Sequence, residues 1–221
     1  MLHILLTVLA LGLRVQSLSM YSYRSFYEVV VPDVETNNIE NAFLDSPEPP
    51  PHTETAKVAR YIVHNSDWGV LSYRSLHAQT MDYPIGAVLS VSDGPVNDSK
   101  GTPYFFVSKL EDVAQDIEVD PRCSLVMTMA QGDYCKTHNL DPQFPTCGQV
   151  WLVGNLEKVA NGTEDETFAR KALFTRHPSM AHWPKDHHFY FMKLNIEKVA
   201  VQDYFGGPVY VDLKEYYGTT P

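Results

Sequence analysis

Apolar residues recur at every second position in several short stretches, and this alternation constrains the fold more than any other feature of the sequence. In "IGAVLSVS", Ile85, Ala87, Leu89 and Val91 form such a series. Side chains two positions apart lie on one face of a strand, so each stretch predicts a strand with one buried face. The other stretches expected to form strands are "WGVLSYRSL", "PYFFVS", "CSLVMTMAQ", "QVWLVGNLEKV", "HHFYFMKLNIEKVAVQDYFGG" (two strands) and "VYV".

Two or three helices are expected among these strands. The first should begin at an N-cap residue, Thr53, and carry a solvated polar stripe made of Thr53, Lys57, Arg60 and His64. A later helix should begin at the capping box of Thr163 and Glu166 and stop at Pro178, and "LEDVAQDI" predicts a short one. Antiparallel strands with a few helices predict a small barrel or another α+β domain.

His64, Ser66 and Asp67 lie within four positions of one another, and these are the residue types of a catalytic triad. A triad requires the histidine to be held between the other two side chains, which adjacency in sequence does not supply. Ser66 and Asp67 are instead expected to bond to the local backbone where the helix ends. We therefore predict a helix end here and assign no catalytic residue.

The N-terminal residues predict a secretory signal. Leu2 to Leu13 are almost wholly apolar, over a length too short to span a bilayer, and Ser17 and Ser19 are small enough to precede a cleavage site. We assign residues 1–19 to a signal peptide, 20–52, which end in "SPEPPPH", to a flexible segment, and 53–221 to one domain. No other apolar run in the sequence is long enough to predict a membrane span.

The composition and the missing motifs exclude several classes of function. The formal charge of −10, with no basic cluster in the sequence, predicts no binding to nucleic acid. The sequence contains no Walker loop and no GxGxxG, GxSxG or HExxH motif. "FGGP" at 205–208 is best interpreted as a turn.

The three cysteines predict one disulfide and one free thiol. Cys123 shares a strand face with Leu125 and Met127, whereas Cys135 and Cys147 flank the polar loop "KTHNLDPQFPT". We therefore pair Cys135 with Cys147 and expect Cys123 to be a buried thiol. Closing a loop of this size should stabilise the fold by roughly 3 kcal/mol. Zinc binding is the alternative, but cysteines at these spacings match no common zinc finger.

Two further groups of residues are candidates for modification or metal binding. The sequons "NDS" at Asn97 and "NGT" at Asn161 predict exposed, glycosylated loops in a secreted chain. A histidine cluster lies between residues 177 and 188. Because neighbouring strand residues point to opposite faces, two of its members should not join one site, and we assign no metal. These imidazoles are expected to be hydrogen-bonded or exposed, and titration in an acidic compartment is an alternative role. The cluster consists of His177, His182, His187 and His188.

The order of several motifs resembles that of the CREG family, the secreted "cellular repressor" glycoproteins. The motifs are "VARYIVHNSDWGVLSY", "LSVSDGP", "GTPYFFVSKL", "SLVMTMAQ", "RHPSMAHWP" and "DYFGGP", and the resemblance runs from about residue 53 to 217. It includes the two cysteines around "DPQFP" and the sequon at Asn161. The resemblance implies an antiparallel split β-barrel of the FMN-binding, pyridoxamine-phosphate-oxidase-like type, assembled as a homodimer.

The same resemblance implies a function without catalysis. It points to a secreted or extracellular glycoprotein, with the endosome or lysosome as a further location, that modulates cell growth and differentiation. A cell-surface or mannose-6-phosphate-type receptor is the implied partner. The name of the family suggests transcriptional repression, but a signal peptide and an acidic surface are at odds with a nuclear role.

An FMN-dependent oxidoreductase is the alternative that the implied fold suggests. In flavin-binding relatives the corresponding segment resembles Ser-x-Leu-Ala-x-His-Thr-x-Asn-Leu, whereas here it reads "SKLEDVAQDI". Ser108 and Leu110 remain, but Val113 and Ala114 stand where His and Thr would be. Glu111, Asp112 and Asp116 would repel a phosphate at close range unless Lys109 or another subunit offsets their charge. The resemblance therefore implies a vestigial flavin site, and we expect no cofactor.

Overall fold

An antiparallel sheet of seven strands organises the computed structural model, which describes residues 48–221. The predicted signal peptide and most of the predicted flexible segment lie outside the described residues. Along the sheet the strands follow the order β2-β1-β4-β5-β6-β3, and β7 pairs with β6. The strands are β1 (Trp68–Arg74), β2 (Pro84–Ser90), β3 (Tyr104–Ser108), β4 (Arg122–Thr128), β5 (Gln149–Lys158), β6 (Phe189–Gln202) and β7 (Val209–Val211).

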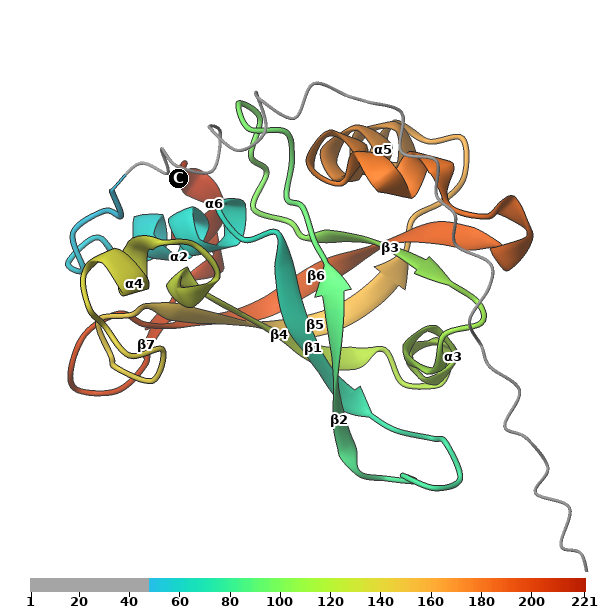
Figure 1. Cartoon of the computed structure of the whole chain (residues 1–221), viewed down its shortest axis with the longest axis horizontal. Helices are drawn as coiled ribbons and strands as arrows, with labels where there is room; N and C mark the ends of the chain where they lie inside the picture. Colours follow the sequence, from blue (N-terminus) through green and yellow to red (C-terminus); the bar gives the residue numbers. More distant parts are fainter. Residues whose placement is uncertain (1–47) are drawn as a thin grey trace, which may run out of the picture. The chain divides into compact units, whose positions relative to one another are not determined.

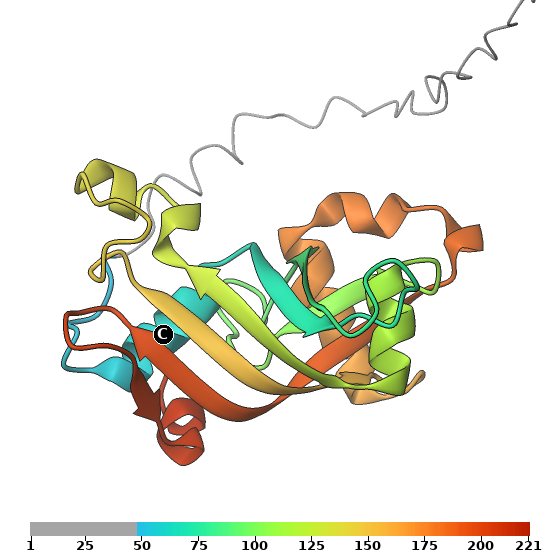
Figure 2. The ribbon, with the colours of Figure 1, turned by 90° about the horizontal axis from the view of Figure 1, so that it is seen from below.

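Three α-helices of eight or more residues pack beside the curled sheet (Figures 1 and 2). They are α2 (Thr55–His64), α3 (Asp112–Val119) and α5 (Glu164–Arg176). Shorter helical turns occur in the loops, namely α4 (Tyr134–Thr137), α6 (Leu213–Gly218), η2 (Met129–Gln131), η3 (Pro178–His182) and η4 (Lys185–His187). This half-barrel with flanking helices is the predicted split-barrel fold. Among the described residues, no helix has the length and hydropathy that crossing a membrane requires.

The stretch expected to form two strands forms one, β6, of 14 residues. It pairs with β5 from Lys158↔Met192 to Gln149↔Gln202, and the register shifts once, between Val153 and Gly154. A Cβ atom added at Gly154 would lie 2.0 Å from the Asn195 carbonyl oxygen, so only glycine fits at this close approach. The prediction of two strands was wrong, because this irregularity bends β6 but does not end its pairing with β5.

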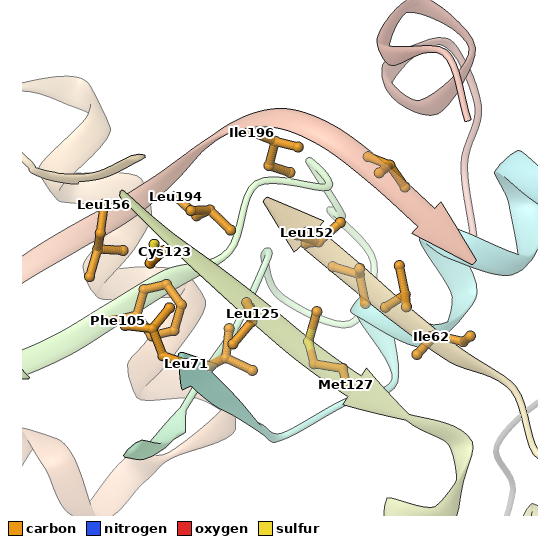
Figure 3. Packing of buried hydrophobic residues seen from close by; sticks show 14 of the residues in the cluster. Ile62, Leu71, Phe105, Cys123, Leu125, Met127, Leu152, Leu156, Leu194 and Ile196 are labelled. Carbon is orange, nitrogen blue, oxygen red and sulfur yellow. The ribbon is translucent and has the colours of Figure 1, made fainter. Parts of the chain in front are cut away.

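The core lies on the concave side of the sheet and follows the predicted alternation (Figure 3). Cys123, Leu125 and Met127 of β4 all point into it, and Leu125 and Met127 are completely buried. From α2, Ile62 packs against the same cluster. The disulfide between Cys135 and Cys147 is present, and Cys123 is a free, buried thiol. Burial raises the pKa of the Cys123 thiol to about 12, so it stays protonated and unreactive.

The predicted solvated stripe of α2 is wrong in two of its positions. Arg60 and His64 are 2% and 8% exposed, and only the N-terminal part of the stripe, with Lys57, is in solvent. The helix also begins one residue later than expected, after the N-cap Glu54 instead of Thr53. The helical period correctly places Arg60 and His64 on a different face of α2 from the apolar core residues. This polar face is nevertheless buried, because a loop and the C-terminal helix cover it.

Asp93, in the loop after β2, is the centre of the polar contacts that bury this face. Its side chain is completely buried and its Oδ1 lies 2.7 Å from His64 Nδ1, while His64 Nε2 lies 2.9 Å from the Val96 carbonyl oxygen. The second carboxylate oxygen accepts hydrogen bonds from the Ser99 hydroxyl and, at 3.0 Å, from the Gly101 amide. Each polar atom of Asp93 and His64 therefore has a partner.

Arg60 joins the same loop to the C-terminus. Its Nη2 donates to the Ser99 hydroxyl at 2.9 Å, and its Nη1 donates to the carbonyl oxygens of Tyr216 and Thr219. The Tyr216 hydroxyl in turn donates to the Gly101 carbonyl oxygen at 2.7 Å. We call Arg60, His64, Asp93, Ser99 and Tyr216 the buried polar network; it fixes the loop of residues 93–101 between α2 and α6.

We predict that Asp93→Asn lowers the free energy of unfolding by about 3 kcal/mol, because it removes a buried carboxylate that accepts hydrogen bonds from Ser99 and Gly101 and contacts His64. Urea unfolding followed by tryptophan fluorescence measures the change. Asp98→Asn is the matched control in the same loop, since Asp98 pairs with Lys100 in solvent and its loss should change stability by less than about 0.5 kcal/mol. Equal effects of the two substitutions would contradict the role given to Asp93.

The same carboxylate predicts a pH dependence. Burial raises the pKa of Asp93, but hydrogen bonds from His64, Ser99 and Gly101 outweigh it and hold the pKa below its usual 3.8. A depressed native pKa contributes stability above the unfolded pKa, near ~4, that is lost as the pH falls through the native one. Between about pH 5 and pH 3 the wild type should therefore lose more stability than Asp93→Asn; parallel profiles would contradict this.

Candidate functional site

The three residues of the possible triad do not converge. His64 is bonded to Asp93 and Val96, the Ser66 hydroxyl donates to the Ile62 carbonyl oxygen at 2.7 Å, and Asp67 lies 3.7 Å from Arg176. The bond from Ser66 to the local backbone confirms the prediction for this residue, whereas the Asp67 carboxylate faces Arg176 instead. His64 therefore serves the buried polar network, and no nucleophile lies beside it.

The segment that the resemblance aligns with a flavin site begins at Ser108, the last residue of β3, and several of its N–H and O–H groups are bonded within the chain. The Ser108 amide donates to Glu111 Oε1 at 2.8 Å, and the Ser108 hydroxyl donates to the His187 carbonyl oxygen at 2.6 Å. The Leu110 amide donates to the Ser108 hydroxyl oxygen at 3.1 Å. These three groups are therefore not free to donate to a phosphate in this conformation.

The two residues that replace His and Thr in this segment point away from solvent. Val113 and Ala114 belong to α3 and are buried in the core, whereas Leu110 is 64% exposed. Glu111 and Asp112 add two negative charges at the start of the helix. Neither the apolar side chains nor the carboxylates offer a hydrogen-bond donor to a cofactor.

Both sequon asparagines are accessible. Asn97 and Asn161 are exposed and lie in turns. Asn97 belongs to the loop that the buried polar network holds in place. Asn161 precedes α5, whose N-cap Thr163 accepts a hydrogen bond from the Glu166 amide at 3.2 Å. Glu166 bonds back to the Gly162 amide at 2.7 Å, one residue earlier than an ordinary capping box, so Asn161 is presented beside a well-formed helix start.

The histidine cluster is dispersed over several environments. His177 Nε2 lies 3.1 Å from the Val91 carbonyl oxygen, and His182 is exposed. His187 and His188 were expected to lie in a strand, and this prediction was wrong. His187 ends η4, His188 has a left-handed backbone with φ 55°, and β6 begins only at Phe189. No group of three or more His, Cys, Asp or Glu side chains among residues 48–221 is arranged to hold a metal ion.

A cleft of about 670 Å³ opens where β3 and β5 end, β6 begins and α5 passes over them. Four aromatic side chains, from β3 and β6, form part of its wall. We call it the basic cleft, because three of its polar residues carry positive charge and one carries negative charge. The polar lining is Lys109, Lys158, Asn161, Glu166, Arg170 and His188.

The convex face of the sheet carries a second feature, an apolar row that crosses four strands. Val88 of β2 pairs with Val70 of β1, and Val70 pairs with Val126 of β4. Val126 pairs in turn with Trp151 of β5. Directly paired residues share one face of an antiparallel sheet. Val88 is 67% exposed. Val153, the next residue after Trp151 on the same face of β5, is 41% exposed. We call Val88, Val70, Val126 and Trp151 the apolar row.

Sequence reasoning missed the basic cleft and the apolar row. The cations of the cleft come from three separate elements, so no basic cluster is visible along the chain. For the apolar row a signal was present, because Val70, Val88 and Val126 occupy the face expected to be polar. A strand with apolar residues on both faces indicates that both faces can be covered.

Comparison with curated proteins finds relatives over most of the chain. A family model described as "CREG, beta-barrel" matches residues 50–218. Protein CREG1 of Homo sapiens is 44% identical over 171 residues, which cover 77% of each protein. Protein CREG1 of Gallus gallus is 41% identical over 174 residues, covering 78% of this chain and 90% of that one.

Solved structures show the same fold at low identity. A heme binding protein from Mycobacterium smegmatis superposes with a TM-score of 0.58 and 16% identity, covering 79% of this chain and 63% of that one. A member of the pyridoxinephosphate oxidase family from Clostridium acetobutylicum gives a TM-score of 0.51 at 11% identity, covering 74% and 99%. These likenesses establish a split barrel, and the family match together with the curated relatives establishes the lineage: the chain belongs to the CREG family.

Proposed function

We propose that this chain is a secreted glycoprotein of the CREG type that acts by binding a partner and not by catalysis. The observation that carries the proposal is that both sequon asparagines are exposed in turns of a disulfide-bonded domain. Disulfides persist in oxidising compartments, and N-glycans are added to accessible loops of chains that enter the secretory pathway. The apolar N-terminal stretch supports the same route.

The proposed role is to modulate cell growth and differentiation through a receptor. Membership of the CREG family supports the absence of an enzymatic activity, and the dispersal of His64, Ser66 and Asp67 is consistent with it. The glycans on Asn97 and Asn161 would allow a mannose-6-phosphate-type receptor to bind, with delivery to the endosome or lysosome. The extracellular space is the other proposed location.

We further propose a homodimer that is formed through the apolar row. The apolar row is exposed at Val88 and partly exposed at its other three residues. An apolar surface that crosses several strands is unfavourable in water and typical of a protein–protein interface. The small or short side chains beside the row, among them Gly86, Ser72 and Ser124, would let a second sheet approach closely. The row lies on the side of the sheet opposite to the core, so pairing would leave the fold of each copy unchanged.

An FMN-dependent oxidoreductase is the second candidate, because the fold is shared with flavin-binding barrels. The contacts of Ser108, Glu111 and His187 argue against it, since they occupy the donors that a phosphate would use. The carboxylates of Glu111 and Asp112 would also repel a phosphate at close range.

Glycosylation tests the secretory proposal. When the full chain is expressed in a secreting eukaryotic host, peptide-N-glycosidase should increase its gel mobility, and Asn97→Gln and Asn161→Gln should each remove one step of that shift. Asn195→Gln is the matched control, because Asn195 is exposed but lies outside a sequon. An unchanged mobility of secreted wild type after enzyme treatment would show that the glycans are absent.

If the homodimer forms through the apolar row, one negative charge placed in that row should weaken self-association. Val88→Glu should weaken self-association by about a hundredfold, because pairing would bury an unpaired carboxylate at a cost of roughly 3 kcal/mol. Light scattering at several protein concentrations measures it. Val119→Glu is the control and should leave the dimer intact, because Val119 lies at the end of α3 and is 71% exposed. A monomeric wild type at micromolar concentration, or an unaffected Val88→Glu dimer, would refute the interface.

The cofactor question has a direct test. The purified protein should be colourless, and micromolar FMN added to it should show no saturable fluorescence quenching, because the donors of the segment at 108–114 are occupied. Free FMN with an unrelated acidic protein provides the baseline for quenching. A flavin absorbance band after purification, or clear saturation, would place the oxidoreductase ahead of the binding role.

A further inference from the structure

The side chains that line the basic cleft fall on two sides of β6. Phe106 of β3 pairs with Phe191 of β6, and Phe189 lies two positions before Phe191, so these three rings share one face of the sheet. Tyr190, between them, faces the opposite side and packs in the main core. Phe191 and Phe106 instead pack against α5, which covers their face. We call the part of the basic cleft that is lined by Phe106, Phe189 and Phe191 the aromatic side.

Asn161 lies at one end of the aromatic side. The Val159 amide, two residues earlier, donates to the Phe191 carbonyl oxygen at 2.9 Å, so the chain leaves β5 beside Phe191. The Gly162 amide, next along the chain, donates to Glu166 Oε2 at 2.7 Å. Asn161 is therefore held between a strand contact and a helix cap, and its exposed side chain is part of the lining of the cleft.

Arg170 joins the cap of α5 to the aromatic side. Its Nη2 donates to Glu166 Oε1 at 3.0 Å, and its Cζ lies 4.9 Å from the centroid of the Phe191 ring and 5.6 Å from that of Phe174. The guanidinium group is thus ordered by a carboxylate and two rings. The Arg170 side chain is nevertheless 53% exposed, and a guanidinium group has five N–H donors, so several of them remain for a ligand.

Aromatic surface continues beside this cation. The Phe106 ring centroid lies 4.8 Å from that of Phe191 and 5.0 Å from that of Phe189. Phe191 is buried, whereas Phe106 and Phe189 are half-buried and present ring surface to the cleft. Aromatic rings next to fixed hydrogen-bonding groups are typical of a site for a ligand with an apolar and a polar part.

A sugar ring has this combination. Its C–H groups pack on the face of an aromatic ring, and its hydroxyl and N-acetyl groups form hydrogen bonds. Arg170 would donate to these groups, and Glu166 would accept from them. The Gly162 amide and then Arg170 lower the pKa of Glu166, so its carboxylate is ionised at neutral pH and acts as an acceptor.

We propose that the first sugars of the N-glycan on Asn161, which are N-acetylglucosamine residues, pack against the aromatic side of the basic cleft. A ligand that is covalently attached at the edge of its site has a high effective concentration, so weak contacts suffice to keep it bound. The cleft has a volume of about 670 Å³, which is in the usual range for small-ligand sites. The inference rests on the proposed glycosylation of Asn161 and gives that glycan a role within the domain, where it covers Phe106 and Phe189 and points in a fixed direction.

Endoglycosidase H tests the proposal, because it cuts between the two core N-acetylglucosamine residues and acts only when they are free of the protein. The secreted full chain is produced in a host that makes only oligomannose glycans, and release from each asparagine is followed by mass spectrometry of the glycopeptides. The reference for each site is its release rate in the unfolded protein. In the native protein, release from Asn161 should be at least about fivefold slower than this reference, since a bound core is cut only in its unbound fraction. Release from Asn97, which does not line the cleft, should be slowed by less than about twofold.

Two substitutions in the cleft identify the contacts. Phe189→Leu removes a ring but keeps an apolar side chain, and Arg170→Gln removes the charged donor. Each should speed release from native Asn161 at least about threefold. Lys171→Gln, on the exposed surface of the same helix, changes the net charge equally and should leave the rate unchanged. Thermal unfolding shows whether each variant is folded at the assay temperature, and Arg170→Gln decides the outcome should Phe189→Leu be unstable, because the Arg170 side chain is half exposed.

Two results would overturn the proposal while leaving the glycosylation itself intact. One is a native release rate at Asn161 equal to that in the unfolded protein. The other is slow release that neither Phe189→Leu nor Arg170→Gln changes, since the local turn and not the cleft would then protect the glycan core. Glycopeptides without a sugar on Asn161 would refute the proposed glycosylation and this inference together, and the peptide mass before endoglycosidase treatment distinguishes that failure from the other two.

Discussion

The buried carboxylate of Asp93 is the interaction on which the arrangement of the helices around this barrel depends. A charge without water must be compensated, and here His64 of α2, the Ser99 hydroxyl and the Gly101 amide do so. Arg60 extends the same network to the C-terminal α6, through the carbonyl oxygens of Tyr216 and Thr219. One buried charge thus fixes the entry helix, the Asn97 loop and the end of the chain relative to the sheet.

The sheet divides the remaining side chains between two surfaces of different chemistry. Its concave face is filled by the alternating residues of β4 and β5 and by α2, whereas its convex face carries the apolar row. The bend at Gly154 lets β6 continue past β5 to β3 and β7, so the long strand borders both the core and the basic cleft. In this CREG family member, Val113 and Ala114 of α3 are buried in the core, whereas Leu110 just before the helix is exposed.

Two further features lie at the surface of the domain, the sequon asparagines and the basic cleft. The asparagines that would carry glycans are presented by rigid local structure, one by the buried polar network and one by the capped start of α5. Cationic and aromatic side chains line the basic cleft, and residues 48–221 contain no group of three or more His, Cys, Asp or Glu side chains arranged to hold a metal ion. The proposed binding of a partner would use these exposed surfaces.

The sequence by itself determined the local properties of this protein: the buried faces of the strands, the pairing of Cys135 with Cys147 and the start of α5 at Thr163. Each follows from residues a few positions apart, through strand or helix period, loop closure or capping. Only the tertiary structure decided that Arg60 and His64 are buried, that β6 is one strand and that valines of β1, β2 and β4 form one row. Their partners lie tens of residues away, and periodicity states which face a residue occupies but not what will cover it.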